Sequence, residues 1–281
     1  MAKLMLDFHT HIFSPYVRDH RDHLAKADPI FSRIYADKEA RMIGVEGLLE
    51  AMDQNGVEQS VVCGFPWQGA EQVRRENAFL LESAHRYPDR IIPFISLPQE
   101  GEAALTELEQ SARAGAQGIG EWAPGTYGDR LWNIETMKPL FAAIKKKGLP
   151  VLIHCNEPLG HPYPGKGRVG IAEMGTLVAA LQGITIILAH WGGGFFFYEL
   201  MPEVAAICQG VYYDTAASPF LYNKRIYQIA IAIIEPQRIL FGSDYPLIPP
   251  RRYKQEMEEA GLAAEAREAI LGLNAKRLLG L

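Results

Sequence analysis

Two histidines near the start of the chain, His9 and His11, are separated by one threonine in the stretch DFHTH. Side chains alternate across a β-strand, so residues two positions apart point to the same face, and Asp7 would lie there too, one layer below. Two imidazoles on one face can bind one metal ion, at about 2.0–2.1 Å for zinc. The pair therefore indicates half of a metal site, although two such residues can also end an ordinary buried strand.

Further residues with acid–base or metal-binding side chains stand at the ends of later apolar runs. Glu121 lies in GIGEW, His154 in VLIHC, His190 in ILAH and Asp244 in ILFGSD. A buried imidazole needs hydrogen-bond partners for both nitrogens, so His154 and His190 indicate metal binding or catalysis rather than simple packing. Glu121 could bind the metal, bind substrate or orient His154. Asp214 ends another run and is a candidate hydrogen-bond acceptor behind a ligand.

Eight apolar runs, each followed by an amphipathic segment, would position these residues. The runs are rich in Val, Ile, Leu and Tyr, which suits parallel strands that are covered on both faces. They predict strands at residues 4–9, 58–64, 90–97, 116–122, 150–155, 184–190, 210–216 and 238–244. The segments between them predict helices at residues 46–55, 69–87, 102–115, 135–147, 171–182, 197–209, 223–235 and from about 251 onwards.

The spacing of these runs predicts the fold. After the first unit, successive strands start roughly 26 to 35 residues apart, which is the length of a βαβ unit. Eight such units predict an α/β fold, a (β/α)8 TIM barrel, as a single domain over residues 1–281. Active sites of this fold lie at the carboxyl ends of the strands, so the residues at the strand ends are expected to converge.

The connection after the first strand is longer than the others. It runs from about residue 12 to residue 44, and we expect a long loop on the carboxyl face of the barrel. Such a loop would form a lid or a pocket wall. Its two histidines, His20 and His23, are expected in solvent, with substrate contact as the alternative.

The composition indicates a soluble globular protein with a large core, because 48% of the residues are hydrophobic and 22% are charged. A net charge of −5 argues against nucleic acid as a partner. The three cysteines, Cys63, Cys155 and Cys208, indicate free thiols in a reducing compartment. The N-terminal stretch is too short and polar for a signal peptide, and no run approaches membrane-spanning length. We therefore expect a cytoplasmic protein without a membrane partner.

Taken together, the motifs resemble the metal-dependent amidohydrolase superfamily, in particular the branch that includes 2-amino-3-carboxymuconate-6-semialdehyde decarboxylase. The matching pieces are DFHTH, GIGEW, VLIHC, ILAHWGGG and ILFGSDYP, together with FFFYELMPEV and YYDTAASPFLY. Each piece alone is weak, but their order is specific in combination. The resemblance covers nearly the whole chain and implies a small-molecule substrate, a possible homodimer and a divalent metal, usually zinc.

The resemblance also implies roles for the strand-end residues. The implied metal ligands are His9, His11, His154 and Asp244. His190 would hydrogen-bond the metal-bound water or the reacting oxygen of the substrate. Other branches hold two metals, so Glu121 and His190 could instead help to bind a second ion, although we favour one. Related decarboxylases of aromatic acids often carry Glu-x-His at the first strand, and the His-x-His of this chain weakens that assignment.

Hydrolysis of an amide, ester or lactone-type bond in a small molecule is the function that we expect first. A metal ion with an open position lowers the pKa of its bound water toward 7. Asp244 could accept a proton from that water, and His190 could stabilise charge that develops on a carbonyl oxygen. These two side chains are the predicted catalytic residues.

Two other functions remain open. Non-oxidative decarboxylation of a small aromatic or unsaturated acid would use the same strand-end residues. It would also need a cation for the substrate carboxylate, and the candidates are Arg18, Arg21, Lys166 and Arg168. A non-catalytic metal-binding barrel is the third function, and it is disfavoured because cysteine and histidine normally close a structural zinc site.

Overall fold

Eight short strands lie side by side in the computed structural model of the protein, which describes residues 5–98, 101–123, 133–167 and 169–281. Each strand pairs in parallel with the next one along the chain. The strands are β1 (Leu6–Thr10), β2 (Gln59–Cys63), β3 (Ile91–Ile95), β4 (Gly118–Trp122), β5 (Val151–Ile153), β6 (Ile186–Leu188), β7 (Val211–Asp214) and β8 (Ile239–Leu240). All eight predicted strands are confirmed.

Hydrogen bonds between β1 and the residues that directly follow β8 close the sheet into a barrel. The backbone N–H of Phe8 donates to the carbonyl of Phe241 at 2.7 Å. The N–H of Asp244 donates to the carbonyl of His9 at 2.9 Å, so two predicted site residues are joined through their backbones. A closed barrel of eight parallel strands confirms the predicted TIM barrel.

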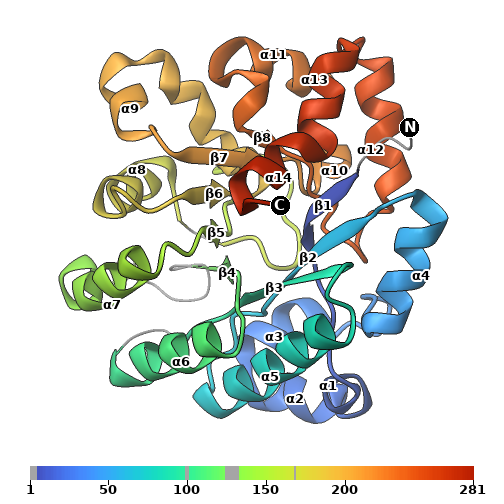
Figure 1. Ribbon diagram of the computed structural model, residues 1–281, viewed down its shortest axis with the longest axis vertical. Coiled ribbons are helices and arrows are strands. Elements are labelled where there is room, and N and C mark those ends of the chain that lie inside the picture. The colour runs from blue at the N-terminus through green and yellow to red at the C-terminus, as the bar shows by residue number, and fades with distance from the viewer. Residues whose placement is uncertain (1–4, 99–100, 124–132, 168) are drawn as a thin grey trace.

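Helices surround the strands in Figure 1 and cover the outside of the barrel. The helices before β5 are α1 (Pro15–Asp19), α2 (Arg21–Ala27), α3 (Pro29–Tyr35), α4 (Val45–Asn55), α5 (Ala70–Arg86), α6 (Gly101–Arg113) and α7 (Ile134–Lys147). Those after it are α8 (Ile171–Ala180), η1 (His190–Leu200), α9 (Pro202–Ile207), α10 (Ser218–Leu221), α11 (Ile226–Ile234), η2 (Pro236–Arg238), α12 (Pro250–Glu259), α13 (Ala264–Glu268), η3 (Ala269–Leu273) and α14 (Asn274–Leu279).

The barrel interior is packed with side chains below the site. Leu6 and Phe8 of β1 pack there with Phe94 of β3, and the rings of Phe8 and Phe94 meet edge to face. Gly118 of β4 makes room for Phe94, because a Cβ at this glycine would lie 2.3 Å from the phenylalanine ring. Ala275, Leu278 and Leu279 of α14 cover the lower end of this cluster. The barrel is therefore a solid support with its chemistry at one end.

The register of β1 departs from simple alternation. Phe8 packs in the barrel interior, and its direct neighbour His9 also points across the barrel toward residues of other strands. The pairing of β1 with β2 shifts register between Asp7 and Thr10. An irregularity of this kind re-aims a side chain at the rim of a barrel, and here it allows both neighbours to face inward.

The long connection after β1 contains three short helices, α1 to α3, where we predicted a loop. The sequence holds start signals for two of them. Ser14 accepts a hydrogen bond from the N–H of Val17, and Asp28 accepts from the N–H groups of Ile30 and Phe31. His20 and His23 are exposed, as expected.

The predicted helix at residues 197–209 is broken. Residues up to Leu200 belong to the 3-10 segment η1, and α9 begins only at Pro202. Proline lacks an N–H and favours the first turn of a helix, which explains the late start.

In the described ranges, none of the helices combines the length and the apolar character that crossing a membrane requires. Cys63, Cys155 and Cys208 are buried free thiols, as the sequence predicted.

Candidate metal centre

His9 and His11 turn their rings toward each other at the mouth of the barrel. Their Nε2 atoms are 3.1 Å apart. Two nitrogens that bind one ion at about 2.0–2.1 Å lie roughly 2.8–3.4 Å apart in octahedral or tetrahedral geometry. Both side chains are buried, His9 completely. The pair has the spacing that one metal ion requires.

Asp214, at the end of β7, sets the orientation of the His9 ring. Its Oδ2 lies 2.8 Å from Nδ1 of His9. A carboxylate only accepts hydrogen bonds, so Nδ1 of His9 carries a hydrogen and Nε2 is left to bind a metal. The other oxygen of Asp214 accepts from the N–H groups of His190 and Ala216 at 2.8 and 3.0 Å. Asp214 therefore has the accepting role that the sequence predicted.

Asp244 follows β8 and lies beside the His9–His11 pair, where the chain after β8 meets β1. Its Oδ1 lies 3.4 Å from Nε2 of His11 and 3.8 Å from Nε2 of His9. The backbone of Asp244 is left-handed, with φ of 58°, which is costly for a residue with a Cβ. Such conformations cluster at functional sites. The ligand atoms of His9, His11 and Asp244 all lie within 4.8 Å of one another.

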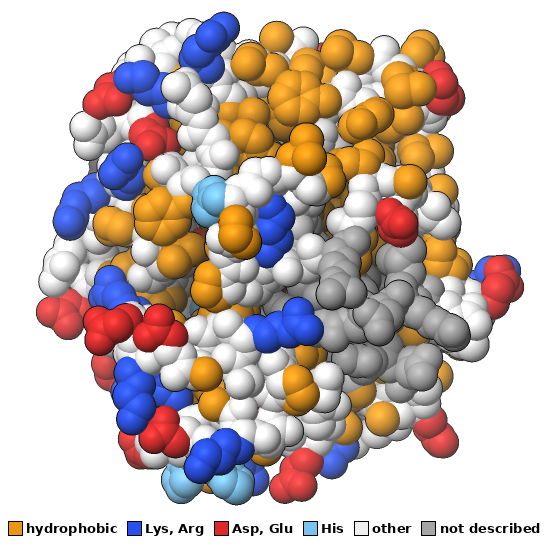
Figure 2. All heavy atoms as spheres, turned by 180° about the vertical axis from the view of Figure 1, so that it is seen from behind, with side chains coloured by type: hydrophobic (Ala, Val, Ile, Leu, Met, Phe, Trp, Pro, Cys, Tyr) orange, Lys and Arg blue, Asp and Glu red, His pale blue; other side chains and the backbone are white. Residues whose placement is uncertain are grey.

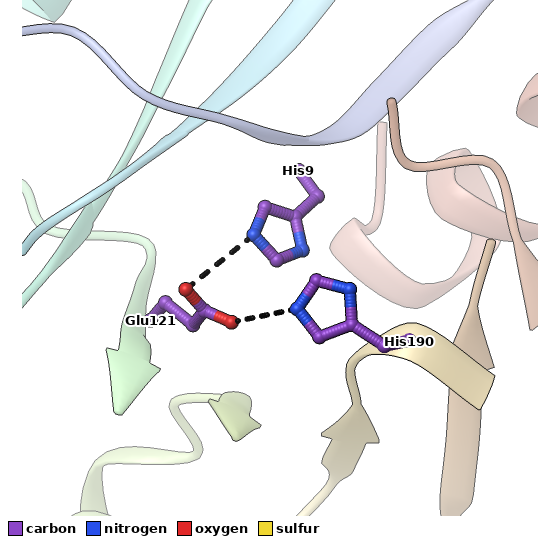
Figure 3. Close-up of side chains that lie close together, drawn as sticks. All are labelled: His9, Glu121 and His190. Carbon is purple, nitrogen blue, oxygen red and sulfur yellow. Dashed lines mark ion pairs between the residues drawn. The ribbon is translucent and has the colours of Figure 1, made fainter. Parts of the chain in front are cut away.

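Glu121, from the end of β4, lies among four histidines. Its Oε2 is 3.6 Å from Nε2 of His11 and 3.7 Å from Nε2 of His9. Its Oε1 is 2.7 Å from Nδ1 of His154 and 3.3 Å from Nε2 of His190. Figure 3 shows the carboxylate between the rings of His9 and His190. The sequence left three roles open for Glu121, and this position is compatible with a ligand and with a residue that orients His154.

His190 follows β6 and completes a second group of candidate ligands. Its Nδ1 lies 3.2 Å from the carbonyl of Ala216, so Nε2 faces Glu121. His190 has a left-handed φ of 55°, as Asp244 does. The ligand atoms of His9, Glu121 and His190 lie within 4.8 Å of one another.

His154 lies beside the cluster but outside both of these groups. Its Nδ1 faces Glu121 at 2.7 Å, and its Nε2 faces Oδ1 of Asn156 at 3.1 Å. The fold therefore brings the six predicted residues to one place. They are His9, His11, Glu121, His154, His190 and Asp244. The role of His154 as a ligand stays a prediction.

Two of the buried imidazoles in the cluster, those of His9 and His190, favour their protonated forms. Burial alone would lower the pKa of His190, but the Glu121 carboxylate outweighs burial and raises this pKa to about 9. Burial likewise opposes protonation of His9, and Glu121 and Asp214 together raise the pKa of His9 well above its ordinary value. The carboxylates of Glu121 and Asp214 thus stabilise positive charge at this end of the barrel.

The pKa values of Glu121 and Asp244 are shifted in the opposite direction, below their usual range. Burial alone would raise the pKa of Glu121, but His154 and His9 outweigh it and hold this pKa well below its usual range. For Asp244, the hydrogen bond from His11 and the charges of His9 and His190 outweigh burial and lower the pKa to about 2. Both carboxylates are ionised at neutral pH.

These residues fit a divalent metal ion. Imidazole nitrogens and carboxylate oxygens are donors that zinc and manganese both accept. His9 already has the tautomer that a ligand needs, and the His9–His11 spacing matches a shared ion. A metal ion bound here would replace the protons that the nearby carboxylates stabilise on His9 and His190.

An aromatic cluster lies between the helices of the long connection and the segment after β2. It contains Phe13, Phe31, Tyr35, Phe65 and Trp67, with ring centroids 4.8–6.5 Å apart. Burial raises the pKa of Tyr35, and the Asp244 and Glu121 carboxylates add to the effect, which places Tyr35 near the acidic centre. The long connection thus forms an apolar wall beside the site.

Two of the cations predicted for a substrate carboxylate are used elsewhere. Arg21 donates to the carbonyls of Tyr35 and Ala40 at 2.7 and 2.8 Å and holds the turn after α3. Lys166 donates to the carbonyls of Leu159 and His161 within its own loop, at 2.6 and 3.2 Å. Both side chains stabilise loop backbone.

Sequence reasoning missed Arg41, whose guanidinium lies over the ring of Tyr245 at 5.6 Å from the centroid. Tyr245 directly follows Asp244, so Arg41 stands near the predicted ligands. Its position in the sequence carries no motif, and only folding of the long connection reveals it. Arg18 is exposed, and Arg168 lies outside the described residues.

Figure 2 shows that hydrophobic side chains gather over the upper part of one face. The exposed large hydrophobic residues include Phe197, Leu200, Phe220 and Leu247. Two shallow apolar hollows lie among them, one beside Phe220 and Leu247 and the other beside Phe197. Neither hollow is lined by a predicted site residue, so the chemistry is not located in these hollows.

Known proteins resemble this chain over most of its length. Gamma-resorcylate decarboxylase from Rhizobium radiobacter is 26% identical over 283 residues, covering 83% of this chain and 86% of that protein. The solved structure of 5-carboxyvanillate decarboxylase from Sphingomonas paucimobilis has a TM-score of 0.80 at 16% identity and covers 99% of each chain. A dihydroxybenzoic acid decarboxylase from a Polaromonas species, solved with manganese and the inhibitor 2-nitroresorcinol, has a TM-score of 0.74 at 18% identity, covering 99% of this chain and 97% of that chain.

These relatives overturn the preference for hydrolysis. All three are decarboxylases, and each is named for an aromatic acid that carries both hydroxyl and carboxyl groups. The strand-end residues suit either reaction, so they could not separate the two functions. The error came from weighing the His-x-His of β1 against decarboxylation. The relatives' metal also differs from the expected zinc, since the Polaromonas enzyme holds manganese.

A match to a protein-family profile covers the whole barrel. A family profile described as Amidohydrolase matches residues 6–281, from the first residue of β1 to the end of the chain. The match includes every strand and every predicted site residue, and it confirms the resemblance that the motifs indicated. This chain belongs to the amidohydrolase family of enzymes.

Proposed function

We propose that this protein is a metal-dependent, non-oxidative decarboxylase of a small hydroxylated aromatic acid. The observation that carries the proposal is the cluster of histidines and carboxylates around Glu121, in a barrel whose relatives carry out this reaction. The aromatic wall and the buried cluster suit a flat, anionic substrate.

A divalent ion would be held by His9, His11, His154 and Asp244, and Glu121 and His190 lie close to His9. When bound, such an ion neutralises the carboxylate and hydroxyl oxygens of the substrate and orients them. Zinc was the expectation from sequence, and the manganese of the Polaromonas relative makes manganese the first ion to test. Metal analysis of the purified protein identifies the resident ion.

The protein's own groups would move the proton. Decarboxylation of an aromatic acid needs a proton at the ring carbon that carries the carboxylate, after which the carbon–carbon bond breaks and carbon dioxide leaves. Asp244 is the ionised carboxylate at the mouth, so it can take a proton from the substrate hydroxyl and return it to that carbon, and a proton from solvent then restores the hydroxyl of the phenol product. His190, held by the carbonyl of Ala216, can stabilise the negative charge on the substrate oxygen.

The wall would set the orientation of the ring. Tyr35 and its aromatic neighbours can contact the apolar edge of the substrate. Arg41 can balance a negative group that points out of the barrel, because it stands over Tyr245 beside the predicted ligands.

The test is a product analysis on the manganese-loaded and zinc-loaded protein with a panel of hydroxybenzoic acids, including 2,6-dihydroxybenzoate and 5-carboxyvanillate. We expect one molecule of carbon dioxide and one of the corresponding phenol per molecule consumed. The Asp244→Asn variant serves as the control and should lose about 10²–10⁴-fold in rate. A metal-loaded wild-type protein that leaves every acid of the panel intact would contradict the proposal.

Two further expectations accompany the proposal. The homodimer implied by the resemblance is checked by sedimentation velocity of the purified protein. A cytoplasmic location is checked by fractionation of cells that express the chain.

A further inference from the structure

Asn156, which follows β5 and is buried, holds its side-chain oxygen in one defined orientation. Oδ1 lies 3.0 Å from the backbone N–H of Gly167. A backbone N–H can only donate, so the oxygen of the amide must face it and not the NH2 group. The N–H of Gly167 thereby fixes the orientation of the Asn156 amide.

The same oxygen determines which nitrogen of His154 carries a hydrogen. Oδ1 of Asn156 lies 3.1 Å from Nε2 of His154. Because this oxygen only accepts, Nε2 of His154 must donate, and Nδ1 is the nitrogen that is left to face the cluster. Nδ1 faces the carboxylate of Glu121 at 2.7 Å, which accepts a hydrogen from it in the metal-free protein, and a metal ion bound at Nδ1 would replace that hydrogen.

The hydroxyl of Tyr163 does not compete for this oxygen. It lies 3.4 Å from Oδ1 of Asn156 but 3.2 Å from Oε2 of Glu157, and it has one hydrogen to give. A carboxylate is the stronger acceptor, so the hydrogen goes to Glu157. Two donors, His154 and Gly167, then match the two lone pairs of the Asn156 oxygen.

The backbone of Asn156 is fixed by a close contact with η1. A Cβ at Gly193 would lie 2.3 Å from the carbonyl oxygen of Asn156, and Gly193 has a left-handed φ of 58°. Glycine alone fits such a position, so the segment after His190 packs directly against Asn156. The amide thus extends from a fixed backbone toward His154.

We propose that Asn156 is a positioning residue that holds His154 with Nε2 as the donor and Nδ1 as the metal-binding nitrogen, and that it links this ligand to the loop segment of residues 156–167. The inference rests on the metal site of the proposed function. Asn156 would do for His154 what Asp214 does for His9, with the roles of the two ring nitrogens exchanged.

The first test is the dissociation constant for zinc, measured by competition with a chromophoric chelator. Asn156→Leu keeps the branched shape of the side chain and removes the acceptor, and it should weaken zinc binding roughly 10–100-fold, as is typical for the loss of an outer partner of a ligand. Asn156→Asp keeps both accepted hydrogen bonds and should bind zinc at least as tightly as the wild type. Asn156→Ala replaces the leucine variant if that variant does not fold.

Asn77 provides a matched control. It is a buried asparagine of α5, and it bonds to the backbone of Ser96 and to Glu107, away from the cluster. Asn77→Leu should lower the thermal midpoint of the metal-free protein without changing the zinc dissociation constant by more than about threefold. Tyr163→Phe should likewise leave zinc binding within about threefold, because its hydrogen goes to Glu157.

The second test is the tautomer of His154 in the zinc-loaded protein, read from long-range ¹H–¹⁵N correlations and assigned with His154→Asn. We expect hydrogen on Nε2 and zinc on Nδ1. Zinc on Nε2, equal losses in Asn156→Asp and Asn156→Leu, or no zinc binding by the wild type would each overturn the inference. A wild type that binds zinc through Nδ1 but decarboxylates no acid would overturn the proposed function and leave this inference standing.

Discussion

His9 and His154 lie on two sides of one cluster and are held in different ways. His9 is fully buried, and its Nδ1 faces the charged carboxylate of Asp214 at 2.8 Å. His154 is half-buried, and its Nε2 faces the neutral amide of Asn156 at 3.1 Å. One acceptor belongs to a strand of the barrel, and the other belongs to a loop.

The difference lies in what each acceptor also holds. Asp214 accepts from the backbone N–H groups of His190 and Ala216, so it joins the ends of β6 and β7 around His9. Asn156 accepts from Gly167, so it joins His154 to the loop after β5. Changes on the His9 side should therefore affect the folded barrel and the metal together. Changes on the His154 side should affect the metal and the loop.

Replacing each histidine in turn is the strongest test of this comparison. His9→Ala should weaken metal binding by more than the roughly 10–100-fold typical of outer partners, because it removes a ligand. It should also lower the free energy of unfolding of the metal-free protein by about 2–3 kcal/mol, since Asp214 loses a charged hydrogen bond in a buried place. His154→Ala should cost less, about 1 kcal/mol, because its side chain is partly exposed and solvent offsets part of the lost bond to Glu121. Urea unfolding measures both, and equal losses would refute the distinction.

Asp214→Asn should produce the next largest effect. The oxygen of the new amide would stay with the N–H groups of His190 and Ala216, so its NH2 group would face Nδ1 of His9. His9 would then accept at Nδ1 and carry its hydrogen on Nε2, which cannot bind a metal in that form. We expect metal affinity to fall by about 100-fold or more with nearly unchanged circular dichroism. Asn156→Asp, the opposite exchange on the other side, should cause no such loss, and a similar loss there would break the comparison.

The sequence predicted the parts of this site that strand alternation and strand order determine. Eight apolar runs were enough to place His9, Glu121, His190 and Asp244 at the same end of the barrel, because parallel strands share their carboxyl edge. It also named Asp214 as an acceptor.

Contacts made by loops could not be read from the sequence in this way. The link from Asn156 to Gly167 spans eleven positions without a periodic pattern, and Arg41 reaches Tyr245 only after α1 to α3 have packed. The register shift in β1 was also missed, since it depends on pairing with β2 rather than on local sequence. The choice of reaction could not be read from the strand ends either, because their residues suit hydrolysis and decarboxylation alike, and the His-x-His of β1 was wrongly weighed against decarboxylation.

The pH dependence of metal binding sharpens the comparison between the two sides. His9 and His190 have raised pKa values, about 9 for His190, so below that pH a metal must displace their protons. Apparent affinity should therefore rise with pH between 6 and 9, about tenfold per pH unit for each proton released. Calorimetry in two buffers with different ionisation enthalpies counts those protons. Proton release that persists in His154→Ala would assign it to the His9 side, and an affinity that does not change with pH would contradict these charges.

The smallest expected effect extends the comparison from the ligands to the loops beside them. Arg41 stands over Tyr245 on the His9 side, whereas Lys166 on the His154 side is used by the carbonyls of its own loop. Arg41→Met removes the charge and keeps a similar length. Because Arg41 is exposed, we expect about a threefold to tenfold rise in KM for the aromatic acid, with kcat nearly unchanged.

Lys166→Met is the matched variant on the other side. It should leave KM within about twofold and instead make the loop segment of residues 156–167 more sensitive to limited proteolysis, because two loop carbonyls lose their donor. Steady-state kinetics at two salt concentrations separate the two cases, since only the contribution of Arg41 should shrink as salt screens its charge. If Lys166→Met raised KM and Arg41→Met did not, the substrate anion would lie on the His154 side, and the orientation proposed for the aromatic acid would have to be reversed.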